Sequence, residues 1–407
     1  MLLTVSKRLE FSASRRLLVR GWNDAENLAA FGPETSARYG TGRNYVAYFV
    51  FSGAVDRANG MLMNISEIKA RIGELLHGGF DHKFLNENNP AFADIPPTAE
   101  HVARQLFDGA RPLFSDSQAQ LVACHLSETP ERSATIYASG ACEANYWFSF
   151  SAARQTMSPH LSSSENEQLF GIAASPYGHG HNYRARLTIR QETAPVVEPI
   201  IMYEQLDDCV RSLRSELDHK NLNHEVPALR GRPITTESLV RYLLERAAAC
   251  MPVARVRLHE RDDFFAEQQI DGQSFVGMQM PFAAAHRLHA ATLPAAENLA
   301  LYGKCNNARG HGHRYLVEAT IGGDYDRRAG TLCDFTAFQT GIAEALRPWQ
   351  DKHLDLEAEE FRDRPSTGEN IVQALWPKMN TRLDDRLTRL RLWETPNNRF
   401  ALRRDGK

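Results

Sequence analysis

Hydrophobic and polar residues alternate along several stretches of the chain. Residues 183–190 (YRARLTIR) and 314–321 (RYLVEATI) carry apolar side chains at every second position, as in a strand with one buried face. Residues 335–347 and 368–380 instead have the apolar spacing of helices, and two short strand-like runs follow them, at 386–395 and 398–404. This order predicts a β-β-α-α-β-β unit of the α+β class, an antiparallel sheet with helices on one face.

The same unit occurs three times. A strand-like opening recurs as EFSASRRL, FSFSAARQ and PFAAAHRL, and three further motifs recur in the same order: TGRNY, HGHNY and HGHRY; FDHKFLN, LDHKNLN and WQDKHLD; PPTAEHV, PITTESL and PSTGENI. Four motifs in register three times indicate a tandem array rather than chance similarity. We expect three domains, at 1–133, 134–266 and 267–407. Joining the copies edge to edge would cover the exposed strands of each sheet.

The amino-acid composition argues against several classes of function. Hydrophobic residues make up 43% of the 407 positions and the net charge is −3, which is typical of a globular protein without a polyelectrolyte partner. No basic block is interleaved with aromatic residues, so we expect no nucleic-acid binding. We also expect no membrane span and no export signal, and the six scattered cysteines suit a reducing cytoplasm.

The third copy carries a candidate metal site. His311 and His313 stand two apart on a predicted strand, so both imidazoles point to the same face, and His286 lies on the preceding strand. Three nitrogen ligands with an open fourth position are typical of a catalytic zinc site. Cys305, six residues before His311, adds a candidate nucleophile or proton carrier.

Taken together, FAAAHRLHA, LYGKCNNARGHGHRY, LCDFTAF, PSTGENI and RLWETP resemble the 6-pyruvoyltetrahydropterin synthase and 6-carboxytetrahydropterin synthase family. The resemblance implies the tunnelling fold, in which three units form a twelve-stranded barrel with helices outside. One chain would then be a covalent trimer, and two chains would stack as a homodimer that resembles the hexamer of the family.

The resemblance also assigns roles. It implies that Zn²⁺ is held by His286, His311 and His313, that Cys305 is catalytic, and that Glu394 anchors the pterin ring through paired N–H bonds. Glu128 and Glu260 hold the anchor position in the other copies. Thr367 and Glu369 match a substrate-binding segment, although a capping box formed with Ser366 explains them equally well.

The copies depart from the family pattern in complementary ways. The family pairs its cysteine with an Asp-His dyad, but the third copy has Gln350-Asp351 there, with His353 nearby. The dyad survives elsewhere, as Asp81-His82 in the first copy and Asp218-His219 in the second.

The first two copies have lost metal ligands. At the three ligand positions the first copy has Arg15, Thr41 and Arg43, whereas the second keeps His179 and His181 but has Arg154. An arginine has no lone pair to give to a metal, so we expect no strong metal site there. We hypothesise that the third-copy site uses a dyad from another copy.

The leading interpretation is a zinc-dependent lyase that eliminates triphosphate from 7,8-dihydroneopterin triphosphate. The interval between Cys305 and His311 favours the pyruvoyl product, and the carboxy product stays open. The pathway stays open as well, between pterin cofactor and modified-nucleoside synthesis. The alternatives are a non-catalytic pterin- or nucleotide-binding protein and an enzyme acting on another pterin or purine.

Overall fold

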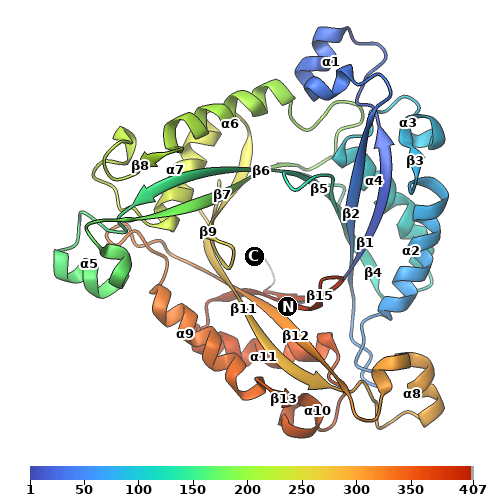
Figure 1. The fold of residues 1–407 in the computed structure, drawn as a ribbon. Helices are drawn as coiled ribbons and strands as arrows, with labels where there is room; N and C mark the ends of the chain where they lie inside the picture. The colour runs from blue at the N-terminus through green and yellow to red at the C-terminus, as the bar shows by residue number, and fades with distance from the viewer. Residues whose placement is uncertain (405–407) are drawn as a thin grey trace.

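The computed structural model describes residues 1–404 as a ring of three similar units around one closed barrel (Figure 1). Each unit contributes two long strands, which form a hairpin, and two shorter ones. The first unit supplies β1 (Leu2–Arg15), β2 (Thr41–Ser52), β4 (Gln120–Ser127) and β5 (Arg132–Tyr137). The second supplies β6 (Cys142–Arg154), β7 (His179–Gln191), β9 (Val253–Arg261) and β10 (Phe264–Gln269). The third supplies β11 (Ser274–His286), β12 (His311–Gly323), β14 (Leu387–Thr395) and β15 (Asn398–Arg403).

Antiparallel pairing joins these twelve strands into a closed ring. Their order is β1-β2-β4-β5-β6-β7-β9-β10-β11-β12-β14-β15, and β15 returns to pair with β1. A closed barrel has no exposed edge along its main strands. The predicted twelve-stranded α+β barrel is therefore confirmed. Three two-residue strands, β3 (Lys83–Phe84), β8 (Lys220–Asn221) and β13 (Lys352–His353), add parallel pairings outside the ring, to β1, β6 and β11.

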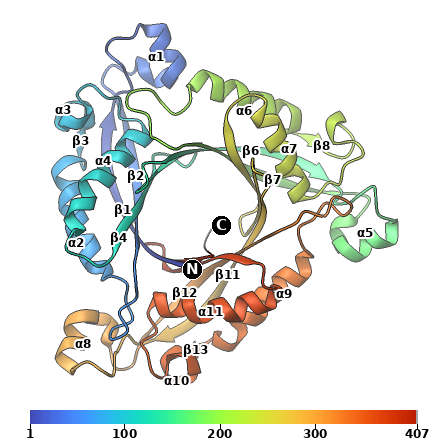
Figure 2. The ribbon, with the colours of Figure 1, turned by 180° about the vertical axis from the view of Figure 1, so that it is seen from behind.

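The helices pack on the outside of the barrel, as the view from behind also shows (Figure 2). The main pairs are α2 (Ile65–Gly79) with α4 (Ala99–Ala110), α6 (Tyr203–Leu217) with α7 (Thr236–Ala248), and α9 (Phe335–Leu346) with α11 (Gly368–Arg382). Shorter helices follow the first strand or the short strand of a unit: α1 (Asp24–Phe31), α3 (Leu85–Asn88), α5 (Ser163–Phe170), α8 (Ala295–Tyr302) and α10 (Leu354–Glu357). None of the helices in residues 1–404 has the length and apolar character that crossing a bilayer requires.

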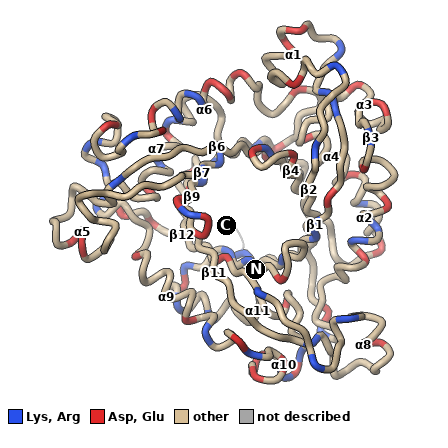
Figure 3. The backbone as a smooth tube through the Cα atoms, viewed as in Figure 1, with Lys and Arg blue, Asp and Glu red and all other residues tan. Residues whose placement is uncertain are grey.

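The core lies between the barrel wall and these helices, and it repeats with the units. Phe11 stacks on Tyr45, Phe150 on Tyr183 and Phe282 on Tyr315, with ring centroids 4.8, 4.9 and 4.9 Å apart. The two rings of each stacked pair are cross-strand partners on the two long strands of one hairpin. Basic and acidic residues are interspersed around all three units (Figure 3).

We propose that the units meet at the turns after β5 and β10, because such boundaries leave every strand whole. The boundaries expected at 133 and 266 lie a few residues earlier, inside β5 and β10. Below, the units are called repeats one, two and three.

Candidate metal and pterin site

The three histidines of repeat three lie together at the end of one hairpin. His286 is the last residue of β11, and it pairs directly with His311, the first residue of β12. His313 lies on the same face of β12, two residues further along. Their ligand nitrogens all lie within 4.8 Å of one another.

The arrangement fits a tetrahedral metal. His286 Nε2 and His311 Nε2 are 3.2 Å apart, close to the roughly 3.3 Å that separates two nitrogen ligands of one zinc ion. His286 Nδ1 lies 3.0 Å from the carbonyl oxygen of Ser366, which accepts a hydrogen bond from the Nδ1–H group and leaves Nε2 as the ligand atom. Nε2 of His313 is buried and, among residues 1–404, has no hydrogen-bond partner. A bound cation would accept the lone pairs of these converging ring nitrogens.

Burial also favours the neutral form of two of these histidines. It lowers the pKa of His311 to about 4, with further contributions from His286 and His313, and it lowers the pKa of His313 as well. Neutral imidazoles present the lone pairs that a metal needs. The residues therefore fit the zinc ion that the sequence predicts.

Glu394 and Cys305 lie beside this cluster. Glu394, near the end of β14, places Oε1 3.7 Å from His286 Nε2 and 3.8 Å from His313 Nε2. Its other oxygen accepts a hydrogen bond from Asn398. Cys305 is half-buried in the turn before β12, and its pKa is raised by burial and then by the Glu394 carboxylate. The structure thus groups the predicted metal ligands, ring anchor and thiol at one place.

Part of this site comes from repeat one. The Thr367 hydroxyl donates to the carbonyl of Gly60 at 2.6 Å, and the Glu369 carboxylate accepts from the backbone N–H of Leu62 at 2.9 Å. The predicted capping box with Ser366 is wrong, because Thr367 is the N-cap of α11 and accepts from the Asn370 N–H, while Glu369 turns toward repeat one. Burial raises the pKa of Glu369 to about 7. Their role in substrate binding stays a prediction.

The two Asp-His pairs lie elsewhere. Ser12 of β1 donates its backbone N–H to Asp81, and the His82 ring lies 3.0 Å from that carboxylate. Asp218 and His219 repeat this arrangement beside β6. Among residues 1–404, neither pair makes a hydrogen bond or ion pair with repeat three. Both imidazoles point to solvent, with 83% and 82% of their surface exposed.

Arginines occupy the equivalent positions in repeats one and two. Arg15 is 1% exposed and forms an ion pair with Glu128, with Nε donating at 2.7 Å. Arg154 is buried in the same way and forms an ion pair with Glu260. In repeat two, His179, His181 and Glu260 still lie within 4.8 Å of one another. A fixed guanidinium thus stands where repeat three has His286, and it neutralises the equivalent of the ring anchor.

Sequence reasoning missed the loop that repeat one contributes to the site. The Tyr302 hydroxyl donates to the carbonyl of Asn59, and Gly60 adopts the left-handed conformation (φ +72°) that favours glycine. Gly330 recurs at the same place in repeat three, with φ +81°. A glycine at the same place in two repeats could have been recognised in the sequence. Asp355 was also missed: it accepts hydrogen bonds from Ser366 and so supports the segment that orients His286.

Comparisons with known proteins agree with the three repeats. The family model described as 6-pyruvoyl tetrahydropterin synthase matches residues 4–139, 145–270 and 276–405. The 6-pyruvoyl tetrahydrobiopterin synthase of Drosophila melanogaster is 38% identical over 133 residues, which are 32% of this chain and 79% of the relative. The Homo sapiens protein of that name is 36% identical over 128 residues, 31% of this chain and 88% of the relative.

A solved structure of the Caenorhabditis elegans 6-pyruvoyl tetrahydropterin synthase is 30% identical, with a TM-score of 0.32. It covers 33% of this chain and 96% of its own. The family match runs through nearly the whole chain, once per repeat. This protein therefore belongs to the 6-pyruvoyl tetrahydropterin synthase family and carries three copies of the family domain in one polypeptide.

Proposed function

We propose that this protein is a zinc-dependent carbon–oxygen lyase that eliminates triphosphate from 7,8-dihydroneopterin triphosphate in repeat three. The observation that carries the proposal is the convergence of His286, His311 and His313 on one point beside Glu394. The names of the relatives support the same class of chemistry. The product is 6-pyruvoyltetrahydropterin or, with cleavage of the side chain beyond its first carbon, 6-carboxytetrahydropterin.

In this proposal each residue of the site has a separate role. Bound zinc would act as a Lewis acid toward the hydroxyl groups of the substrate side chain. Glu394 would accept two N–H bonds from the pterin ring and so fix the side chain toward the histidines. Cys305 would take a proton from side-chain carbon as the C–O bond to triphosphate breaks, which requires a thiolate and hence a basic partner. His286 is held in place through Ser366.

That basic partner comes from a second chain in our proposal. Repeat three has Gln350-Asp351 at the dyad position, and its own His353 lies 3.9 Å from Asp355, outside that position. The pairs of repeats one and two point to solvent next to their own β1 and β6. Exposed imidazoles held by neighbouring carboxylates are poised to reach a facing molecule. A homodimer of two stacked rings would bring His82 or His219 of one chain to Cys305 of the other.

The first test combines metal content with turnover. We expect one zinc per wild-type chain and release of triphosphate from dihydroneopterin triphosphate. Cys305→Ala should retain zinc and lose turnover, and either His82→Ala or His219→Ala should lose turnover, with the unaffected histidine variant as its matched control. One zinc without turnover in the wild-type protein would contradict the lyase.

A mixing experiment tests the second chain. Cys305→Ala protein and the double variant His82→Ala/His219→Ala are each expected to be inactive. Unfolded together and refolded at equal amounts, they would form mixed dimers in about half of the molecules, each with one complete site. We expect about a quarter of wild-type activity. No recovery, together with dimers shown by mass, would contradict a dyad donated between chains.

One observation favours a second candidate. Repeat three has Gln350 and Asp351 where the dyad would be, and in residues 1–404 no other repeat supplies one. A protein that binds a pterin or nucleotide without turnover would need only the metal cluster and Glu394. Stoichiometric zinc and tight pterin binding without triphosphate release would establish it.

A further inference from the structure

Repeat one also reaches Glu394 through its first strand. Lys7 of β1 and Asn398 of β15 are cross-strand partners at the place where these two strands close the barrel. The Lys7 ammonium group donates to the Asn398 amide oxygen at 2.9 Å, and the Asn398 amide nitrogen donates to Glu394 Oε2 at 3.2 Å. The three side chains therefore form one hydrogen-bonded chain that ends on the carboxylate.

The two ends of this chain fix the orientation of the amide between them. An ammonium group can only donate hydrogen bonds, and an ionised carboxylate can only accept them. The Asn398 side chain must therefore turn its oxygen toward Lys7 and its nitrogen toward Glu394. Without the lysine, the amide could rotate by half a turn and present its oxygen to the carboxylate, which would repel it. A positive charge bound to the amide oxygen also makes the amide N–H a stronger donor.

Charge couples Lys7 to Glu394 as well. Burial lowers the pKa of Lys7 and the nearby Lys69 lowers it further, whereas the Glu394 carboxylate raises it. Lys7 is half-buried, and charges in such places are screened less than charges on the open surface. The other oxygen of Glu394 lies 3.7 Å from His286 Nε2. The carboxylate thus stands between a lysine of repeat one and the metal cluster of repeat three.

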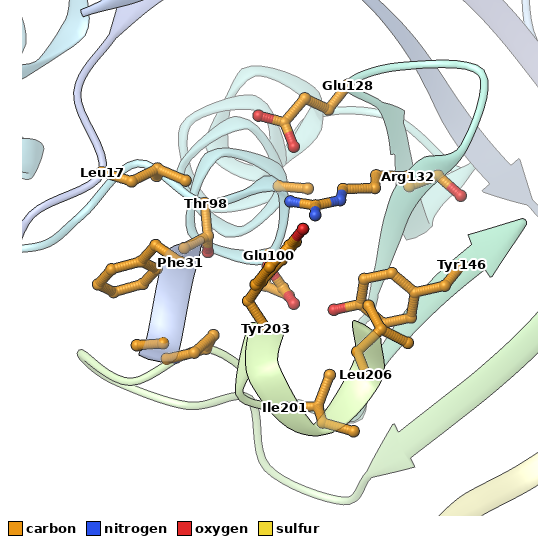
Figure 4. Close-up of a pocket in the computed structure, with 14 residues that line it drawn as sticks. Leu17, Phe31, Thr98, Glu100, Glu128, Arg132, Tyr146, Ile201, Tyr203 and Leu206 are labelled. Atoms are coloured by element: carbon orange, nitrogen blue, oxygen red, sulfur yellow. The ribbon is translucent and has the colours of Figure 1, made fainter. Parts of the chain in front are cut away.

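Repeats one and two lack this chain at the equivalent positions. The residue four places after the equivalent of Glu394 is Arg132 in repeat one and Phe264 in repeat two. The cross-strand partner of that residue is Tyr146 in repeat one and Met278 in repeat two, in place of the lysine. Figure 4 shows the arrangement in repeat one, with Arg132 and Tyr146 around the space next to Glu128.

The first two repeats neutralise their equivalents of Glu394 in a different way. Arg15 and Arg154 form ion pairs with Glu128 and Glu260, from the strand position that His286 has in repeat three. Among residues 1–404, Glu394 has no ion pair with an arginine or a lysine, and only the histidines lie close to it. The chain from Lys7 therefore brings a fixed positive charge to this carboxylate in the one repeat that keeps all three histidines.

We propose that Lys7 is a positioning residue for the site in repeat three: acting through Asn398, it holds the Glu394 carboxylate in the orientation that accepts the N–H groups of the ring. The inference rests on the proposed function, in which Glu394 is the ring anchor. Such an anchor must present two oxygens in one plane to two parallel N–H donors. Because β1 belongs to repeat one, the anchor is correctly oriented only when the β1–β15 ladder is closed.

The experiment measures the dissociation constant of pterin (2-amino-4-oxopteridine) by ligand fluorescence, together with the zinc content of each variant. Lys7→Met should weaken pterin binding about tenfold, the size expected for a lost hydrogen bond to a charged group, and should keep the zinc content of the wild-type protein. Lys7→Arg keeps the charge and the donor, so it should restore most of the affinity. Lys69→Met is the matched control: it removes a nearby charge that has no bond to Asn398, and pterin binding should not change.

A double variant separates positioning from a general effect on the ladder. If Lys7 acts through Asn398, Lys7→Met/Asn398→Ala should bind pterin no more weakly than Asn398→Ala alone. Losses that multiply in the double variant, normal binding by Lys7→Met, or no recovery in Lys7→Arg would each overturn the proposal.

Glu394→Gln tests the proposed function separately, because it changes the anchor itself. Wild-type pterin binding by Glu394→Gln would show that Glu394 is not the anchor, and the role of Lys7 would fall with it. Weak binding by Glu394→Gln together with normal binding by Lys7→Met would contradict the role of Lys7 alone. Pterin binding is measured without turnover, so failure of the lyase is distinguishable from both.

Discussion

Replacing Arg154 by histidine should give repeat two a metal site. Arg154 pairs in register with His179, as His286 does with His311. The ring centroids of His179 and His181 are 4.9 Å apart, the same separation as for His311 and His313. The strand geometry therefore already places two of three ligands, and Arg154→His supplies the third.

The expected change in the free energy of unfolding comes from the ion pair of Arg154 with Glu260. Arg154 is 3% exposed and contacts Glu260, and removing one partner of a buried pair costs about 3–5 kcal/mol. Without metal, we expect Arg154→His to lose free energy of unfolding near the lower end of this range. The reason is that the Glu260 carboxylate still has a partner in the variant, since His181 Nε2 lies 3.2 Å from it. Zinc at about 1,000 times its dissociation constant restores about 4 kcal/mol, since it binds only the folded chain.

The assay is zinc per chain after dialysis, together with urea unfolding with and without zinc. Arg154→His should hold one more zinc than wild type, and only the variant should regain this stability in zinc. Arg15→His is the control: repeat one has Thr41 and Arg43 in place of the two strand histidines, so its metal content should not rise. An unchanged zinc count for Arg154→His would refute the reasoning from strand register.

Three further predictions concern separate parts of the molecule. Burial raises the pKa of Glu237 to about 7, above the roughly 4.3 of an unfolded chain, so the free energy of unfolding should fall as pH rises between these values. Glu237→Gln should remove this pH dependence and raise the free energy of unfolding at pH 8, measured in urea, by about 1–3 kcal/mol. An unchanged pH dependence in the variant would contradict the prediction. Gly368→Ala should cost about 1–3 kcal/mol, because its Cβ would lie 2.1 Å from an aromatic ring of β15, whereas Gly73→Ala in α2 has open space and should not destabilise. His311→Ala should abolish zinc binding while His179→Ala keeps it; metal analysis giving the same content for both would argue against the site in repeat three.

Much of the fold could be predicted from local pattern. The alternation at 183–190 and 314–321 corresponds to β7 and β12, and the helices expected at 335–347 and 368–380 are α9 and α11. The shared face of His311 and His313 followed from strand periodicity, because residues i and i+2 point the same way, and His286 was added from the preceding strand and the family resemblance. Edge-to-edge joining followed from the cost of open edges, and the closed barrel confirms it.

The rest depends on contacts between distant parts of the chain. Glu369 looked like half of a capping box, and only the closure of the ring reveals that Leu62 donates to it. The ion pairs of Arg15 and Arg154 required the spatial position of Glu128 and Glu260, which lie over 100 residues away. No periodicity in a single sequence encodes such partners.

The closure of the barrel has one more consequence. Two of the joints between repeats are covalent turns, but the third consists of the β1–β15 ladder, in which Leu2 pairs with Arg403 and Lys7 with Asn398. The first and last strands of the described chain, β1 and β15, lie side by side there, as Figure 1 shows. This seam is where the ring can open without breaking a peptide bond. An opened molecule would present two complementary strand edges, so at high concentration β15 of one chain can pair with β1 of another and build domain-swapped rings of six or more repeats.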